Sequence, residues 1–89
     1  MSDDTVPRVT FPCSYPIKVM ARADPGVRQQ VDRIVEQHAG PLDPAKVTER
    51  PSARNRFVGI TYIIEASGEA QIAMLFDALK GCPHVLLVL

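Results

Sequence analysis

The chain has 89 residues, of which 46% are hydrophobic and 22% charged, and its formal net charge is zero. This length predicts a single domain with a small core. Balanced charge excludes a global positive field that would draw nucleic acid or anionic membranes, so any electrostatic site must be local. No apolar run comes near the roughly 20 residues that a membrane-spanning helix requires.

The first residues and the two cysteines indicate the cellular compartment and the limits of the domain. Residues 1–5 are polar and acidic, unlike a secretory signal. Two cysteines, Cys13 and Cys82, make neither a disulfide framework nor a zinc-binding spacing, so we expect a protein of the reducing cytoplasm. Residues 1–10 show no hydrophobic period, which predicts a flexible tail ahead of one domain over residues 11–89.

The first half of that domain predicts a strand, a helix and a weaker strand. Residues 15–22 alternate between apolar and wetter positions, as half-buried strands do. Asp24 and Pro25 then predict a helix start with Asp24 as its cap, and Gly40 predicts the helix end, with apolar residues between them at helical spacing. Residues 45–52 are charged, which suits a strand at a sheet edge.

The second half centres on residues 56–66, the most β-prone stretch of the chain. Its even-numbered positions are nearly all apolar and predict a core side, whereas the odd-numbered ones are mixed and predict a partly open sheet face. Asn55 tolerates a positive φ and predicts a tight turn before this strand. Ser67 is the expected cap of a second helix, and residues 85–89 are apolar enough for a last strand.

The resulting order is strand, helix, strand, strand, helix, strand. Two amphipathic helices need one sheet face to cover, and each links strands through a right-handed crossover. The compact solution is an α+β fold, the ferredoxin-like split βαββαβ sandwich. We expect an antiparallel sheet with spatial order fourth, first, third, second, and both helices on one face.

Several short segments in this order resemble the YbeD-like family of small bacterial proteins, over about residues 11–89. They are Phe11-Pro12, Tyr15 with Lys18-Val19-Met20, His38, Arg50-Pro51-Ser52, and the closing Val85 with Val88-Leu89. The resemblance implies a ferredoxin-like fold similar to ACT regulatory domains. Some members are encoded beside a lipoyl-group transferase, which implies a link to lipoate metabolism. The family often has Ser-Ser-basic-Gly at the hairpin, where this chain has Ser52-Ala53-Arg54-Asn55.

Positive charge is concentrated around the predicted hairpin. Arg50, Ser52, Arg54 and Arg56 are candidates for a small anion or phosphate site, because guanidinium groups match such oxygens in a bidentate fork. The alternative is a solvated hairpin whose charges protect a sheet edge, since no glycine-rich phosphate loop accompanies them.

The predicted open face offers a second candidate, an interaction surface. Its expected members are Lys18, Met20, Phe57, Thr61, Ile63 and either Leu86 or Val88. Contiguous apolar patches of this kind mark binding surfaces, although scattered exposed apolar residues are also normal. We therefore expect a non-enzymatic regulatory or interaction module that docks a protein, including a second copy of itself. The alternative is an ACT-like sensor of a small ligand, an amino acid or an anion, bound between subunits.

Other chemistry finds little support in the residues. We find no carboxylate pair, nucleophile–base pair or metal-ligand set that the sequence would place together, so neither enzymatic activity nor a metal or cofactor is expected. His38 and His84 are isolated, and His84 lies far along the chain from any acidic residue that could partner it. Nucleic-acid binding is not expected either, because residues 56–62 lack the row of aromatic platforms that stack bases.

Overall fold

The structure is a computed structural model that describes residues 10–52 and 54–89. Its regular elements follow one another in the order that the sequence predicts, with a short 3₁₀ turn ahead of the second strand. Of the predicted tail at residues 1–10, residues 1–9 lie outside the described residues. The elements are β1 (Cys13–Arg22), α1 (Val27–Ala39), β2 (Val47–Pro51), β3 (Phe57–Ala66), α2 (Glu69–Lys80) and β4 (Val85–Val88).

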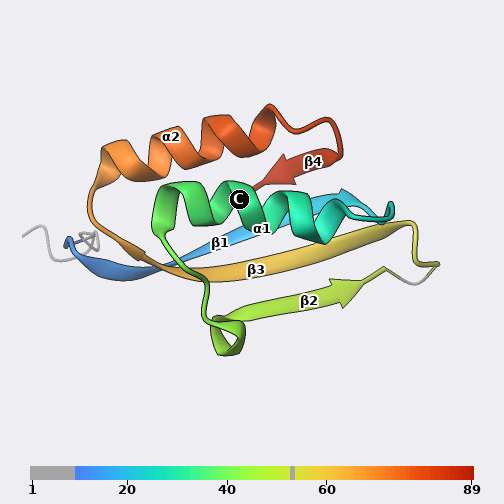
Figure 1. The fold of residues 1–89 in the computed structure, drawn as a ribbon, viewed down its shortest axis with the longest axis horizontal. Helices are drawn as coiled ribbons and strands as arrows, with labels where there is room; N and C mark the ends of the chain where they lie inside the picture. The colour runs from blue at the N-terminus through green and yellow to red at the C-terminus, as the bar shows by residue number, and fades with distance from the viewer. Residues whose placement is uncertain (1–9, 53) are drawn as a thin grey trace, which may run out of the picture.

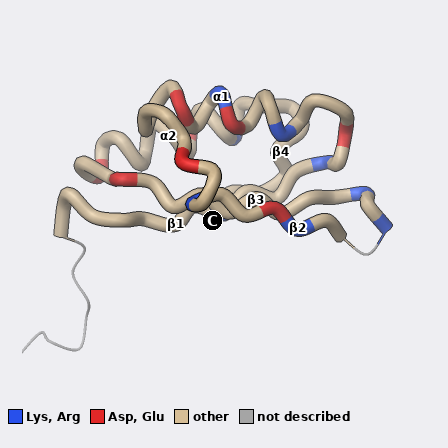
Figure 2. Tube along the Cα trace, turned by 60° about the horizontal axis from the view of Figure 1, so that its bottom comes forward, with Lys and Arg blue, Asp and Glu red and all other residues tan. Residues whose placement is uncertain are grey.

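The four strands form one antiparallel sheet in the order β2-β3-β1-β4. Both helices lie against the same face of this sheet, in front of it in Figure 1 and above it in Figure 2, and no helix or strand of residues 10–52 and 54–89 covers the other face. This is the predicted ferredoxin-like arrangement, and the predicted strand order is confirmed. Within the described residues no helix is both long and apolar enough to cross a membrane.

The two central strands, β1 and β3, pair along their whole length, from Cys13 opposite Ala66 to Arg22 opposite Phe57. Directly opposed residues in an antiparallel pair point to the same side of the sheet. The register therefore assigns every side chain of both strands to one face or the other. The edge strand β2 continues the pattern, with Val47 opposite Tyr62 and Pro51 opposite Val58.

The core lies between the sheet and the helices, on the side that the alternation predicts. Successive inward positions of β3 are buried, and they meet one stripe of each helix. The fully buried large side chains of the core are Ile17, Val19, Val31, Val35, Ile60, Tyr62, Leu75 and Leu79. The alternation along the strands and the helical spacing of apolar residues in α1 and α2 therefore account for burial on this one face of the sheet.

The predicted start of α1 is wrong. The helix begins at Val27, after Gly26 in a left-handed conformation with φ 79°, and the first turn has no side-chain cap. The side chain of Asp24 instead lies 3.0 Å from Nδ1 of His84, in the loop that leads to β4. Folding thus gives His84 the acidic partner that its sequence position did not predict.

The predicted cap of α2 is also wrong. Gly68, not Ser67, occupies the cap position, without a side-chain hydrogen bond. The backbone N–H and hydroxyl of Ser67 both donate to Oε1 of Gln71, at 2.6 and 3.0 Å, and Nε2 of Gln71 donates to the carbonyl of His38 at 2.8 Å. Gln71 thus connects Ser67 to the end of α1, and no side chain caps α2.

Candidate functional site

The candidate site is the face of the sheet opposite the helices, which we call the open face. Strand pairing arranges its side chains in rows across the sheet. One row runs Arg50, Gly59, Met20, Leu87, and the next runs Thr48, Thr61, Lys18, Leu89. Phe57 and Ile63 lie on β3 beyond the two rows, one at each end. Of the predicted members of this face, Lys18, Met20, Phe57, Thr61 and Ile63 are therefore brought together.

Val88 is a correction to that set. It is only 8% exposed, because it lies opposite Val19 on the core side. The register of β4 shifts between Met20 and Ala21, so that Leu86 is an extra residue between two paired positions. The simple alternation assumed from the sequence fails at such a bulge. Leu87, opposite Met20 and 51% exposed, takes the place predicted for Val88.

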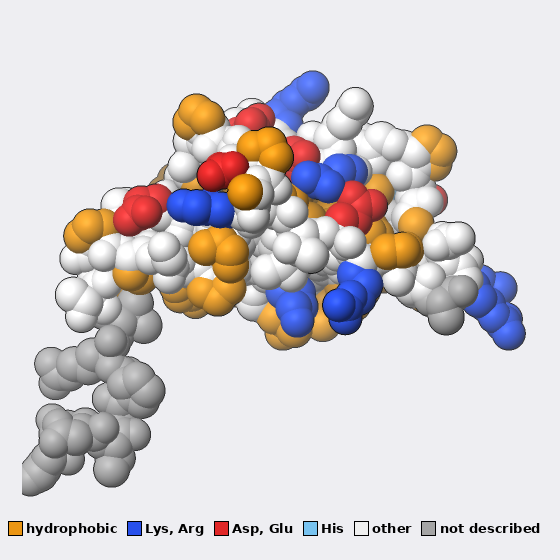
Figure 3. All heavy atoms as spheres, turned by 90° about the horizontal axis from the view of Figure 1, so that it is seen from below, with side chains coloured by type: hydrophobic (Ala, Val, Ile, Leu, Met, Phe, Trp, Pro, Cys, Tyr) orange, Lys and Arg blue, Asp and Glu red, His pale blue; other side chains and the backbone are white. Residues whose placement is uncertain are grey.

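The exposed large apolar side chains of the described chain gather on the sheet rather than on the helices. Only Met74 is on a helix; the others are Met20, Phe57, Ile63, Leu86, Leu87 and Leu89. Figure 3 shows hydrophobic side chains beside Lys and Arg at the lower rim, where the open face lies. The face therefore combines apolar and cationic character.

A hollow of about 430 Å³ opens on the β2 side of this face, above Gly59. Its lining comes from three neighbouring strands and from the start of the hairpin. The lining residues are Lys18, Met20, Thr48, Arg50, Pro51, Ser52, Gly59 and Thr61. Two cations and three hydroxyl groups thus surround the same space, and among residues 10–52 and 54–89 no acidic side chain lines it. Such a lining suits a negatively charged group.

The hairpin between β2 and β3 divides the predicted anion-binding residues. Asn55 has φ 53°, as predicted for its turn. Arg50 and Ser52 line the hollow, whereas Arg54 and Arg56 are exposed on the hairpin and do not line it. Figure 2 shows Lys and Arg positions at this end of the sheet. The four residues therefore do not form the single cluster predicted from the sequence.

Ser52 organises the hairpin through its hydroxyl group. Its Oγ accepts hydrogen bonds from the backbone N–H groups of Arg56 and Phe57, at 3.2 and 3.1 Å. Its own backbone N–H donates to the carbonyl of Phe57 at 2.8 Å. Two backbone donors that could have bound an anion are thus already satisfied, so an anion site must use the side chains over the sheet.

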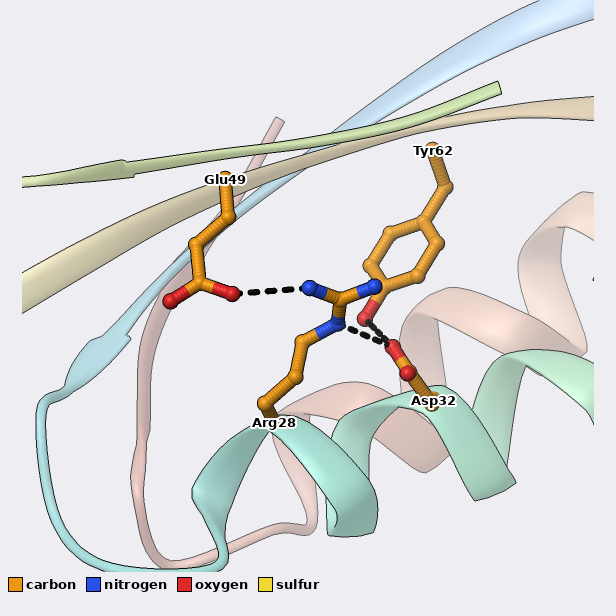
Figure 4. A network of polar contacts seen from close by, with 4 residues as sticks. All are labelled: Arg28, Asp32, Glu49 and Tyr62. Carbon is orange, nitrogen blue, oxygen red and sulfur yellow. Dashed lines mark hydrogen bonds and ion pairs between the residues drawn. The ribbon is translucent and has the colours of Figure 1, made fainter. Parts of the chain in front are cut away.

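The helix side of the sheet carries a polar network that no local pattern predicted (Figure 4). The hydroxyl of Tyr62 donates to Oδ1 of Asp32 at 2.5 Å, and Nε of Arg28 donates to the same oxygen at 2.8 Å. Nη1 of Arg28 reaches Oε1 of Glu49 on β2 at 2.7 Å. The network links α1 to β3 and to the edge strand, and so it supports the strand that carries Thr48 and Arg50.

The network shifts the pKa values of two of its members. Burial raises the pKa of Tyr62 well above its usual range, and the hydrogen bond to Asp32 raises it further. The hydrogen bond to Asp32 is the main cause that raises the pKa of Arg28. Both groups therefore stay protonated across the physiological range, which fits a structural rather than a proton-transferring role.

Within residues 10–52 and 54–89, no group of three or more His, Cys, Asp or Glu side chains could hold a metal ion. Sequence reasoning missed three members of the hollow, Thr48, Pro51 and Gly59. Glycine inside an otherwise β-prone strand was the available signal, because such a residue often marks close approach of a ligand or another backbone.

Comparison with known proteins fits this fold. Residues 7–89 match a family described as "Protein of unknown function (DUF493)". The chain belongs to the DUF493 family. A UPF0250 protein of Bordetella parapertussis is 36% identical over 81 residues, which cover 91% of this chain and 89% of the relative. A UPF0250 protein of Hahella chejuensis is 33% identical over 88 residues, covering 99% and 97%.

These matches confirm the resemblance to the YbeD-like group of small bacterial proteins. Among solved structures, protein HP0495 from H. pylori superimposes with a TM-score of 0.76, covering 100% of this chain and 93% of its own. Its sequence is only 18% identical, so it supports the ferredoxin-like fold of this DUF493 member and nothing beyond the fold.

Proposed function

We propose that this DUF493 protein is a non-catalytic, regulatory interaction module that docks a partner protein on its open face. The observation that carries the proposal is the distribution of exposed apolar side chains. Leu87 and Leu89 are 51% and 64% exposed, and with Met20 they form an apolar strip on the β4 side of the face. A sheet face left bare of helices and lined in this way is the kind of surface that partners cover.

The charge of the face favours a particular partner. Lys18, Arg22 and Arg50 all project from it, whereas Glu65 is its acidic residue, near the far end of β3. Two copies docked face to face would bring cations against cations, which costs free energy at an interface. We therefore propose a different protein as the partner, with acidic side chains around an apolar contact.

The test uses matched substitutions on the two sides of the molecule. Ile63→Asp and Leu87→Asp place a charge on the open face, and Met74→Asp places the same charge on an exposed apolar residue of α2. All three sites are exposed, so each variant should fold, as circular dichroism would verify. Immobilised wild type and variants would be exposed to bacterial extract, and any captured protein would then be purified and its affinity measured.

The proposal expects one purified partner that both open-face variants bind at least tenfold more weakly, whereas Met74→Asp binds it like the wild type. Equal affinity for all three variants would overturn it. Native mass spectrometry tests whether the open face binds a second copy of the chain. A concentration-dependent homodimer that Leu87→Asp dissociates would show that the face takes a second copy, contrary to the charge argument.

The cytoplasmic location and the link to lipoate metabolism belong to the same proposal. The location is proposed from the cysteine usage of the sequence, and the pathway from the YbeD-like resemblance. Both stay predictions.

A further inference from the structure

Gly59 is a residue type that its position in a β-strand does not favour. It lies in the middle of β3, a central strand rich in β-branched and aromatic residues. Glycine there loses more conformational freedom on folding than other residues do and packs nothing. Its φ is not positive, unlike those of Gly26 and Gly40, so the backbone does not require it.

Packing does not require glycine at this position either. A Cβ atom added at residue 59 would lie 3.8 Å from the carbonyl oxygen of Arg50 and 3.9 Å from Cε of Met20. These are ordinary van der Waals distances, so the packing leaves room for a Cβ atom at this position. What the glycine does achieve is to leave the floor of the hollow open, since any side chain at residue 59 would project into that space.

The groups around this open floor are donors and cations. Arg50 lies on β2 and Lys18 on β1, the two strands that flank β3, so their long side chains bracket the hollow from both sides. The hydroxyl groups of Thr48 and Thr61 lie in the row of Lys18. Arginine binds carboxylate and phosphate oxygens through a planar fork, and lysine binds them as a point charge.

Ser52 adds a further donor at the rim. Because its Oγ already accepts from the N–H groups of Arg56 and Phe57, the group that it can still offer is its own hydroxyl hydrogen. Neither Lys18 nor Arg50 forms an ion pair within the described part of the chain, in contrast to Arg28 on the other face. Among the described residues, both cations of the hollow are thus unpaired, and hydroxyl groups that can donate hydrogen bonds lie beside them.

We propose that the hollow above Gly59 is a binding site for a small organic anion. Its carboxylate or phosphate group is held by Lys18 and Arg50, and a short apolar part packs against Met20 and Pro51. The volume of about 430 Å³ falls at the lower end of the 300–1,000 Å³ range of small-molecule sites, which suits a compact ligand. The open face would thereby supply the small-ligand sensor expected as the alternative function, inside one subunit instead of between two.

This site shares Lys18, Met20 and Arg50 with the docking proposal, but the two proposals are tested by different variants. The hollow lies on the β2 side of the face, whereas the apolar strip of Leu87 and Leu89 lies on the β4 side. A ligand could bind without any partner, and a partner could bind without any ligand, so either proposal can fail alone.

The test is a titration of the ¹⁵N-labelled full chain followed by amide NMR, with inorganic phosphate, acetate, butyrate and butyl phosphate as probes. We expect saturable shifts centred on the amides of Gly59 and Thr61. Butyrate should bind more tightly than acetate, by at most roughly fourfold for each methylene group that becomes fully buried. Shifts centred on Arg54 and Arg56, or no saturable shift with any of the four probes, would overturn the site.

Two kinds of variant separate the hollow from general positive charge. Gly59→Val fills the floor and keeps both cations, whereas Arg50→Gln and Lys18→Gln each remove one cation from an exposed position. Each should weaken butyl phosphate binding at least tenfold. The control is Arg33→Gln, which removes an exposed cation from α1 and should leave the affinity unchanged.

The outcomes decide the proposal in either direction. Equal weakening by Arg33→Gln and Arg50→Gln would mean diffuse electrostatic attraction and would refute the site. Unchanged binding in Gly59→Val, with its fold verified by its amide spectrum, would refute the role of the hollow. If that variant does not fold, the comparison of Arg50→Gln with Arg33→Gln still decides.

Discussion

The two faces of this sheet are built from alternate residues of the same strands, yet they differ in almost every respect. Under the helices, Ile17, Ile60 and Tyr62 are fully buried, and the described buried polar side-chain atoms all have partners. On the open face, neighbouring residues such as Lys18 and Met20 are exposed. The period of two along a strand thus lets one segment form the core on one side and an exposed surface of mixed character on the other.

The cations show the difference most clearly. Arg28, beside the helix side of the sheet, contacts both Asp32 and Glu49, whereas Arg50 on the open face has no ion pair within residues 10–52 and 54–89. Glu49 and Arg50 are adjacent on β2 and point to opposite faces. The helix side therefore pairs its charges internally, whereas Arg50 on the open face is unpaired within the described residues.

The largest difference between the core and the open face is expected when one leucine of each is shortened to alanine. Leu75→Ala opens a cavity in the fully buried core and should lower the free energy of unfolding by about 2–5 kcal/mol. Leu87→Ala removes an exposed side chain and should change it by less than about 0.5 kcal/mol. Urea unfolding followed by circular dichroism measures both, and similar losses would mean that the open face also forms a core.

Removal of the shared acceptor tests the polar network. Asp32→Ala leaves the hydroxyl of the buried Tyr62 without its partner, so we expect a loss of about 1–3 kcal/mol in the free energy of unfolding. The double variant with Tyr62→Phe removes both partners and should recover part of that loss. A double-mutant cycle from urea unfolding gives the coupling energy, and a value of zero would mean that the contact adds nothing.

Alkaline pH should reveal the same network. Because burial and Asp32 raise the pKa of Tyr62 in the folded chain, the unfolded chain releases this proton first, above about pH 10. The contribution to stability is complete below that pH and declines above it, by up to about 1.4 kcal/mol per pH unit. The difference in unfolding free energy between wild type and Tyr62→Phe should shrink from pH 9 to pH 11; a constant difference would contradict the pKa shift.

The smallest expected effect is an increase in the free energy of unfolding. Gly59→Val places a β-branched residue in the middle of a strand, where the added Cβ meets nothing closer than 3.8 Å. We expect the free energy of unfolding to rise by up to about 1 kcal/mol, because valine restricts the unfolded chain and favours the extended backbone. Thermal unfolding measures the change, and a destabilised variant would show that glycine serves packing after all.

Much of the fold was predictable because its signals are local. The alternation over residues 56–66 identified the core side of β3, and Asn55 marked the turn before it. Both cap predictions failed because another contact took the expected side chain, a long-range contact at Asp24 and a local one at Ser67. Asp24 pairs with His84 instead of capping α1, and Ser67 bonds to Gln71 instead of capping α2. In β4, which is apolar on both sides, only the pairing of Val88 with Val19 decided which side faces the core.

The sequence by itself determined the element order, the antiparallel ferredoxin-like topology and the inward side of the central strands, since hydrophobic period and crossover handedness suffice for these. Only the tertiary structure decided which polar groups meet. Lys18, Arg50 and Gly59 come from three strands and share one hollow, and Arg28, Glu49 and Tyr62 are joined across the helix–sheet interface. Contacts between residues so far apart along the chain depend on strand register and helix placement, which no local pattern specifies.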